Sequence, residues 1–282
     1  METNIDAIIV TYNPKVGLLN KEIKCIARQV DTITIVNNSK ESLKEIVSYA
    51  NTCIINIGKN IGIGAAQNIA ISKILETSKE GFFVFFDQDS IIPENYIKKM
   101  IQYIDKLKLK NIASYGPTVY NRYDNREYKK SHNEKNYGSF SLVSEIISSG
   151  SIVPKISFKT VGLFNEKLFL DYVDFEWCWR ARNKGYNIVQ LDTILNHQVG
   201  QKSLKVFGKV ELIKCAPFRC YIQLNSYSLL LKEKYVPIYW KISNGIKLIL
   251  MTILFPIIYK ERIQYLKYMI KGYSSLLRNL FF

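Results

Sequence analysis

Short apolar runs that alternate with amphipathic stretches restrict the fold of this chain more than any other feature. Four such runs, rich in β-branched or aromatic residues, occur at 7–11, 33–36, 53–57 and 82–86. Strands covered on both faces of a sheet have this composition. Between the runs, apolar residues recur at helical spacing, namely Leu18, Leu19, Ile23, Ile26 and Ala27, then Leu43, Ile46, Val47 and Ala50, then Ile69, Ala70, Ile74 and Leu75. The order β-α-β-α-β-α-β predicts an α/β fold with a mostly parallel sheet flanked by helices.

Polar and small residues follow each predicted strand, at the edge where parallel α/β sheets bind ligands. These segments are Thr11-Tyr12-Asn13-Pro14, Asn37-Asn38-Ser39, Gly58 to Gly64 and Asp87-Gln88-Asp89. Ordinary turn chemistry also explains each of the first three, because Asn, Pro, Gly and Ser are common turn residues. Four such segments on one edge of the sheet nevertheless predict a ligand site there.

The segment Asp87-Gln88-Asp89 carries the most chemical information. Two carboxylates at i and i+2, directly after an aromatic strand, point the same way, and their repulsion is unfavourable unless a cation or solvent relieves it. A Mg²⁺ or Mn²⁺ ion held by carboxylates and completed by substrate phosphates fits this arrangement. The alternative is an exposed turn before a helix that is capped at Ser90 and has Pro93 in its first turn.

The middle of the chain contains a polar stretch and a further predicted strand. Residues from Tyr120 to Gly138, including His132, are highly polar and predict a long flexible loop, either a lid or acceptor-binding element or a solvated insertion. The run from Ile146 to Val153 predicts a strand, in which Gly150 permits close approach of a ligand or of backbone.

A helix is predicted from Tyr172 to Lys184, ending at Gly185. Charged residues crowd its beginning, and ordinary structural roles explain some of them. Asp171 immediately precedes the helix and suits an N-cap. Glu176 and Arg180 stand at i and i+4 and suit an ion pair.

Asp174 has no such structural explanation. Its helical neighbours at i+3, i+4 and i+7 are Trp177, Cys178 and Ala181, which form an apolar face. Asp174 is therefore expected to point inward, toward a cleft. A partly buried carboxylate beside a binding site is a candidate general base.

The second histidine, His197, follows a strand predicted at 188–191. A single histidine is more often structural than a ligand. Here its position after the last strand of the body would let it complete a metal site with Asp87 and Asp89.

The charge of the chain is unevenly distributed. The whole sequence carries a formal net charge of +15, which favours nucleic acid, an anionic membrane surface or phosphorylated small molecules as partners. Residues 200–282 contain 14 Lys or Arg and three acids, so about +4 remains for the body. The sequence therefore predicts two regions, a domain over 1–200 and a basic, aromatic, helical region over 201–282.

Cysteine usage and the N-terminus both favour the cytoplasmic side of the membrane. The five cysteines are dispersed and contain no C-x-x-C pair, which favours a reducing compartment over a disulfide scaffold or a zinc ribbon. No base precedes Lys15, so the basic n-region of a signal peptide is missing.

The basic region contains an apolar segment, Leu248 to Tyr259, of 12 uncharged residues. A membrane-spanning helix needs about 20 residues, and Pro256 would kink it, so a span is disfavoured. Tyrosines, a tryptophan and lysines on both sides instead predict an element that lies on an anionic membrane surface. Packing against the body or formation of a homodimer are the alternatives.

Seven motifs together resemble those of family 2 glycosyltransferases with the GT-A fold, and within them bacterial rhamnosyltransferases of polysaccharide assembly. In chain order they are IVTYN, IVNNS, NIGIGAAQN, FFDQDS, SSGSIV, VGLFNEKLFLDYVDFEWCWRARNKGY and NHQVG, spanning about Asp6 to Gly200. The resemblance implies a Rossmann-like, mixed but mostly parallel sheet. It also implies a nucleotide-sugar donor, Mn²⁺ or Mg²⁺, and inversion at the anomeric carbon.

The resemblance also implies roles for individual residues. Donor binding falls to Thr11, Tyr12, Asn13, Asn37, Asn60, Gly62, Asp87, Gln88, Asp89 and Gly150, metal binding to Asp87, Asp89 and His197, and catalysis to Asp174 as the base with Asp171 and Glu176 beside it. Relatives commonly carry aspartate where this chain has Asn37. An amide still offers an acceptor to a pyrimidine, although nucleotide preference is then less well specified.

The expected function is transfer of L-rhamnose from dTDP-L-rhamnose to a lipid-linked glycan, in synthesis of a bacterial cell-surface polysaccharide at the cytoplasmic face of the cell membrane. A homo-oligomer is compatible with this function. UDP-galactofuranose, UDP-glucose or a similar donor on the same scaffold is the alternative. A basic nucleic-acid-binding protein is the alternative from another class, but the sequence contains no recognisable motif for it and nucleic acid is not expected as a partner.

Overall fold

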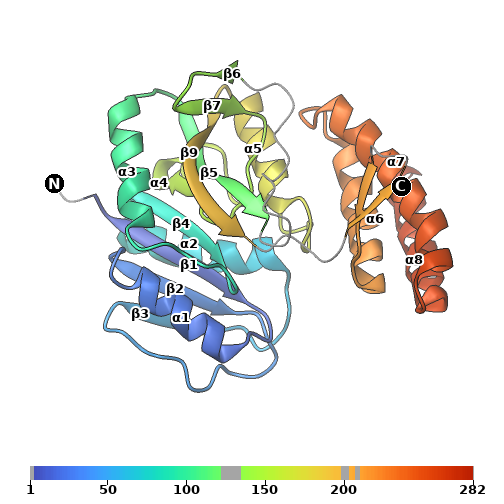
Figure 1. The fold of residues 1–282 in the computed structure, drawn as a ribbon, viewed down its shortest axis with the longest axis horizontal. Helices are drawn as coiled ribbons and strands as arrows, with labels where there is room; N and C mark the ends of the chain where they lie inside the picture. Colours follow the sequence, from blue (N-terminus) through green and yellow to red (C-terminus); the bar gives the residue numbers. More distant parts are fainter. Residues whose placement is uncertain (1–2, 122–134, 198–202, 207–209, 282) are drawn as a thin grey trace. The chain divides into compact units, whose positions relative to one another are not determined.

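The computed structural model describes residues 3–121, 135–197, 203–206 and 210–281. The chain divides into two compact units (Figure 1). The first unit comprises Met1–Glu166 and Val173–Gln198, and the second comprises Lys167–Tyr172 and Val199–Phe282.

The first unit is built on one mixed sheet, which has nine strands in the described part of the chain and the order β3-β2-β1-β4-β8-β5-β9-β7-β6. The strands are β1 (Ile5–Thr11), β2 (Thr32–Asn37), β3 (Thr52–Asn56), β4 (Phe82–Asp87), β5 (Ile112–Asn121), β6 (Lys135–Asn136), β7 (Phe140–Val143), β8 (Ile152–Pro154) and β9 (Asn187–His197). β3, β2, β1 and β4 are all parallel, as is the pair β5 and β9, whereas β8 and β7 run antiparallel to their neighbours. The predicted mixed, mostly parallel sheet is confirmed.

Helices cover both faces of this sheet (Figure 1). They are α1 (Val16–Ile26), α2 (Ile63–Thr77), α3 (Tyr96–Leu107), α4 (Lys155–Thr160) and α5 (Val173–Asn183). α1 and α3 pack on one face, where Ile23 and Met100 join Ile9 in the core. On the other face Phe85 of β4 meets Phe158 of α4 at 6.0 Å between ring centroids. Alternate residues of β4 therefore pack on opposite faces of the sheet, as predicted from a strand that is apolar throughout.

The helix predicted around 43–50 is not present, so that expectation is wrong. Glu45 has a φ of 57°, outside the helical region. The amide of Asn20, on α1, donates to the Glu45 carbonyl at 2.9 Å and accepts from the Val47 N–H at 2.9 Å. A side chain thus satisfies backbone groups that a helix would have paired internally.

The strand predicted from Ile146 to Val153 is also shorter than expected. Only Ile152–Pro154 forms β8. Before it the chain turns, with the Ser151 N–H donating to the Ser148 carbonyl at 2.9 Å and Gly150 at a φ of 79°. The turn requires glycine at this left-handed position.

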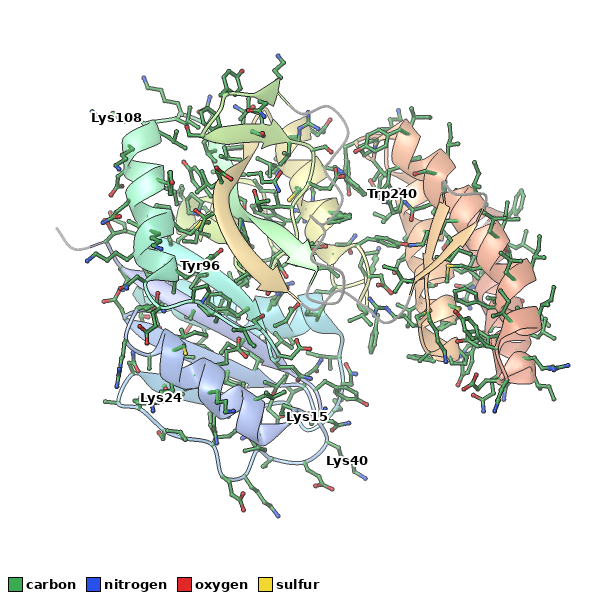
Figure 2. The ribbon with its side chains drawn as sticks, viewed as in Figure 1. Lys15, Lys24, Lys40, Tyr96, Lys108 and Trp240 are labelled. Carbon is green, nitrogen blue, oxygen red and sulfur yellow. The ribbon has the colours of Figure 1, made fainter. Side chains whose placement is uncertain are left out.

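The second unit contains three long helices, α6 (Pro217–Lys232), α7 (Ile238–Ile258) and α8 (Arg262–Phe281), and a hairpin of β10 (Ser203–Val206) and β11 (Val210–Ile213). Its core is formed by Leu212, Cys220, Leu224, Leu248, Met251, Phe255, Tyr265 and Met269. Trp240 of α7, labelled in Figure 2, packs edge-on against Tyr172 at 4.9 Å between ring centroids. Tyr172, in the segment Lys167–Tyr172, therefore packs against a helix of the second unit.

Helix α7 is longer than the 12-residue uncharged run suggests. It has 21 residues and continues through Pro256. Among the described residues, α7 is the one helix that is long and apolar enough to cross a membrane. An 18-residue segment of it has a mean hydropathy of 1.6, and 17% of that segment is buried. The sequence argument against a span counted only the uncharged residues between Lys247 and Lys260. The helix itself begins earlier, at Ile238, and includes Lys247.

Candidate active site

The four polar segments predicted to bind ligand lie along one edge of the sheet. The register pairs Val10 with Asp87, Thr11 with Asn37, and Asn37 with Asn56. The ends of β1, β2, β3 and β4 therefore stand side by side at the carboxyl edge, where α/β sheets bind ligands.

The segments after β1 and β4 are joined by Gln88. Its side-chain carbonyl accepts from the Tyr12 N–H at 2.7 Å, and its amide donates to the Tyr12 carbonyl at 3.2 Å. The next residue, Asn13, has a φ of 45° and donates its N–H to the Ser39 hydroxyl at 2.7 Å. Gln88 therefore holds the two loops together through backbone groups, and the Tyr12 side chain remains half exposed.

Asn37 is fully buried and its amide is engaged by the protein. Its Nδ2 donates to the Glu41 carbonyl at 2.7 Å and to Asn56 Oδ1 at 2.8 Å, while its Oδ1 accepts from the Ser39 N–H at 3.2 Å. An aspartate would lack both donor hydrogens. The structure thus gives asparagine a structural reason to occupy this position.

Asn38 organises the loop that follows β3, a role that sequence reasoning did not assign to it. Its Nδ2 donates to Asn60 Oδ1 at 2.9 Å, and its Oδ1 accepts from the Ile61 N–H at 2.9 Å. Asn60 Oδ1 also accepts from the Gly62 N–H at 3.0 Å. Gly62, at a φ of 90°, immediately precedes α2. Helix N-termini favour anions, so this loop suits a phosphate.

A buried glutamate near Asp87 and Asp89 also escaped sequence reasoning. Glu22 lies on α1 with 3% of its surface exposed, and neither carboxyl oxygen has a hydrogen-bond partner among the described residues. Burial, and to a smaller extent the charges of Asp87 and Asp89, raise its pKa to about 10. The sequence could have indicated this burial, because Glu22 follows Leu19 by three residues and so lies on the helix face that packs into the core.

The edge has the donor groups that a divalent cation requires. Asp87 and Asp89 supply carboxylate oxygens, which Mg²⁺ and Mn²⁺ prefer. Asp87 raises the pKa of both Glu22 and Asp174, so the region carries negative charge that a cation would offset. The described residues contain no complete set of three metal ligands, and the side chain of His197 lies outside them. Asp87 and Asp89 therefore fit part of a metal site.

Asp174 lies in the first turn of α5 and is partly buried. Its Oδ2 accepts from the Ser148 N–H at 3.1 Å and its Oδ1 from the Phe175 N–H at 2.9 Å. The pKa of Asp174 is raised to about 6, chiefly by burial; the two N–H groups partly offset this rise, and the charge of Asp87 adds to it. A small pocket beside it is lined by Ser114, Ile146, Ile147, Ser148, Ser151, Val153, Phe164, Trp177 and Cys178. At neutral pH Asp174 is thus an ionised carboxylate with a raised pKa, which suits a general base.

The other two predicted catalytic acids are held in ion pairs. Glu176, with 1% of its surface exposed, accepts from Arg180 Nε at 2.8 Å and Nη2 at 3.1 Å. This confirms the predicted i,i+4 pair. Asp171, predicted as an N-cap, instead accepts from Arg219 Nη2 at 2.6 Å within the second unit. Both acids therefore have structural partners that Asp174 does not share.

Packing, in addition to the left-handed backbone conformation, requires glycine at position 150. A Cβ there would lie 2.6 Å from Leu195 Cδ2 and 2.8 Å from the Tyr96 hydroxyl. Tyr96 of α3, labelled in Figure 2, donates that hydroxyl to the Gly150 carbonyl at 2.7 Å. The close approach that glycine allows is to protein atoms, and its contact with a donor stays a prediction.

Two predicted features fall outside what the structure describes. His132 and most of the loop from Tyr120 to Gly138 lie in residues 122–134, which are not described. The backbone of His197 ends β9, paired with Asn121, but its side chain is not described. A role for His197 as a metal ligand stays a prediction.

Comparison with known proteins gives a consistent result. The family model for glycosyl transferase family 2 matches residues 6–164. A Shigella flexneri protein named dTDP-rhamnosyl transferase RfbF is 34% identical over 95% of this chain and 93% of its own length. The low-salt glycan biosynthesis hexosyltransferase Agl10 of Haloferax volcanii is 22% identical over 71% of this chain and 70% of its own length.

Solved structures share the fold at low identity. S. aureus TarS 1-349 in complex with UDP-GlcNAc has a TM-score of 0.58 at 15% identity, over 97% of this chain and 81% of that structure. GalNAc-T7 with UDP, GalNAc and Mn²⁺ has a TM-score of 0.55 at 12% identity. That match covers 90% of this chain, which spans 57% of the length of GalNAc-T7.

Proposed function

The chain belongs to glycosyl transferase family 2 and is a glycosyltransferase, and we propose that it transfers L-rhamnose from dTDP-L-rhamnose to a lipid-linked glycan with inversion. The observation that carries the donor assignment is the 34% identity to the dTDP-rhamnosyl transferase over nearly the whole of both chains. The acceptor is proposed to be an intermediate of a bacterial cell-surface polysaccharide, such as a capsule, an O-antigen or a wall polymer.

Donor binding is assigned to the carboxyl edge of the sheet. Thr11 is fully buried there, so its side chain would support this edge from beneath, and the donor would meet the residues around it. The nucleoside is placed beside Tyr12, whose ring is half exposed. The diphosphate is placed between the loop at Gly62 and the carboxylates at Asp87 and Asp89.

The divalent cation belongs to the same proposal. Asp87 and Asp89, with His197, would hold Mn²⁺ or Mg²⁺, and the bound ion supplies positive charge to the diphosphate leaving group. Without that charge, the two carboxylates would repel a diphosphate.

Asp174 performs the proton transfer in the proposed reaction. Its carboxylate accepts the proton of the acceptor hydroxyl while the hydroxyl oxygen bonds to the anomeric carbon. The bond from that carbon to the diphosphate oxygen breaks on the opposite face, and nucleoside diphosphate leaves. The N–H groups of Ser148 and Phe175 fix the orientation of the carboxylate. Because the pKa of Asp174 is about 6, it is ionised at neutral pH and still a stronger base than an ordinary aspartate.

Thermal stabilisation by nucleotides tests the donor assignment independently of the acceptor. We expect dTDP with Mn²⁺ to raise the melting temperature more than UDP with Mn²⁺, because binding to the folded state stabilises it. Asp89→Asn should lose the Mn²⁺-dependent part of that shift. Asp105→Asn, an exposed aspartate on α3, is the matched control and should retain it. A larger shift with UDP would reassign the donor to a UDP-sugar. Oligonucleotides that raise the melting temperature as much as dTDP would count against nucleotide-sugar binding at this edge.

A further inference from the structure

Helix α7 exposes a continuous stripe of isoleucines. Six of them are between 50% and 73% exposed, namely Ile238, Ile242, Ile246, Ile249, Ile253 and Ile257. Their spacing of four, four, three, four and four residues places them on one face of the helix. The opposite face, with Trp240, Leu248, Met251 and Phe255, is buried. Large contiguous apolar surface of this kind marks an interaction site.

Helix α8 carries a matching stripe. Five of its exposed apolar residues form it, namely Ile263, Leu266, Ile270, Leu277 and Phe281, again at helical spacing. The Thr252 and Tyr273 hydroxyls lie 3.0 Å apart, and the rings of Phe255 and Tyr265 lie 5.4 Å apart. Residue numbers thus rise along α7 as they fall along α8, so the helices are antiparallel. On each helix, the exposed stripe lies next to the side that contacts the other helix. Around both helices, the turn from the contact side to the stripe follows the direction of increasing residue number. For antiparallel helices, this places both stripes on the same side of the second unit.

Basic residues border the stripe on α8. Lys271 and Arg278 line a pocket together with Tyr221, Ser274 and Ser275, and Lys271 Nζ lies 4.6 Å from the centre of the Tyr221 ring. Along α8 both bases lie about a quarter of a turn from Ile270 and Leu277. The pocket therefore places two cations and three hydroxyl-bearing residues next to an apolar surface.

The local charge identifies the partner. From Ile238 to Phe281 the chain has seven Lys or Arg and one acid, Glu261. A second copy of this face would bring like charges together. An anionic lipid surface matches both the charge and the apolar stripe, because bases attract the headgroups while the isoleucines enter the acyl region.

We propose that the isoleucine stripes of α7 and α8 form a lipid-contacting surface that lies in the plane of an anionic bilayer, with the pocket at Lys271 and Arg278 receiving the phosphate of a lipid headgroup. This proposal builds on the proposed lipid-linked acceptor, because it places the enzyme at the surface where such an acceptor lies. An in-plane position fits better than a span. The buried face of α7 packs on the unit's own core, and Lys241 Nζ on α7 donates to the Leu231 and Glu233 carbonyls at 2.9 and 2.8 Å.

Vesicle flotation of the full chain tests the proposal. We expect binding to vesicles of phosphatidylcholine with phosphatidylglycerol, weakened at high salt, and little binding to phosphatidylcholine alone. Ile246→Ser combined with Ile253→Ser should weaken the partition by about tenfold per residue, since each loses part of a buried isoleucine's transfer free energy. Lys271→Gln combined with Arg278→Gln should weaken it about 25-fold, from about a factor of five per base. Free inorganic phosphate should not compete if the headgroup is held as part of a bilayer.

Matched controls separate this result from general effects of exposed residues. Ile156→Ser removes an isoleucine of 56% exposure in the first unit, and Lys98→Gln with Lys99→Gln removes two exposed bases from α3. Neither control should change the partition. Melting temperatures of the stripe variants should match that of the wild type, because their side chains are exposed.

Three outcomes would overturn the proposal. The first is absence of wild-type binding to anionic vesicles at low salt, and the second is equal binding by the stripe variants. The third is a lipid-free dimer that Ile246→Ser with Ile253→Ser converts to a monomer, which would make a second copy the occupant. Release of dTDP from donor in water, without acceptor or lipid, is measured in parallel. A variant that loses flotation but keeps this hydrolysis separates failure of the surface from failure of the proposed function.

Discussion

Replacement of Asp174 by asparagine tests the proposed base most sharply. The amide keeps the shape of the carboxylate and one acceptor for the Ser148 or Phe175 N–H, but it cannot take up the acceptor's proton. Loss of a positioned base typically lowers the rate by about 10² to 10⁴. We therefore expect Asp174→Asn to lose transfer by this factor and to retain stabilisation by dTDP with Mn²⁺.

The raised pKa adds a second readout. With a pKa of about 6, Asp174 is about 90% ionised at pH 7 and about 10% ionised at pH 5. Transfer by the wild type should thus fall about tenfold over this range, while the residual rate of Asp174→Asn should lack that step. Initial rates of dTDP release with acceptor, measured from pH 5 to pH 8, give both results.

The same pKa sets an expectation for stability. A carboxyl whose pKa is higher in the folded state stabilises the fold fully below its unfolded pKa, and this contribution is lost as pH rises through the folded value. From the ordinary value of 3.8 to about 6, the loss amounts to at most about 3 kcal/mol at neutral pH. Asp174→Asn should therefore be no less stable than the wild type at pH 7. Near wild-type transfer by this variant, or an unchanged pH profile, would refute the assignment of the base.

Two further predictions concern the architecture around the site. The pKa of Glu22 rises from 4.5 to about 10, so the free energy of unfolding should fall by up to about 1.4 kcal/mol per pH unit between pH 5 and pH 9, and Glu22→Gln should remove this dependence in urea titrations. A wild type and variant with parallel pH dependences would contradict it. Gly150→Ala should cost about 1 to 3 kcal/mol more than Gly138→Ala, because both glycines have positive φ but only Gly150 meets Leu195 and Tyr96 within 3 Å. Equal losses in chemical denaturation would show that crowding is unimportant there.

Residues with a strong local signal were predictable from the sequence. The four apolar runs became β1, β2, β3 and β4. β1, β2 and β4 are mostly buried, as their composition predicts, whereas β3 is an edge strand with no buried residue. Gly185, expected to end the helix of Asp174, has a φ of 87° just beyond α5. The i,i+4 pair of Glu176 and Arg180 depended only on helical spacing and also formed.

Features that depend on distant partners were not predictable. The segment around Glu45 had helical periodicity, but Asn20 takes up its backbone groups instead. Asp171 had the local position of an N-cap, yet its partner, Arg219, lies 48 residues away. Local pattern does not encode such contacts, so tertiary interactions override it.

The central claim is tested most directly by measuring which nucleotide sugar is consumed. Purified full chain with Mn²⁺ and a lipid-linked glycan acceptor would be offered dTDP-L-rhamnose, UDP-galactofuranose and UDP-glucose in parallel, with nucleoside diphosphate release and glycosylated lipid both quantified. The account predicts acceptor-dependent release of dTDP and addition of one deoxyhexose to the lipid, lost in Asp174→Asn. Turnover of a UDP-sugar in place of dTDP-L-rhamnose would contradict it.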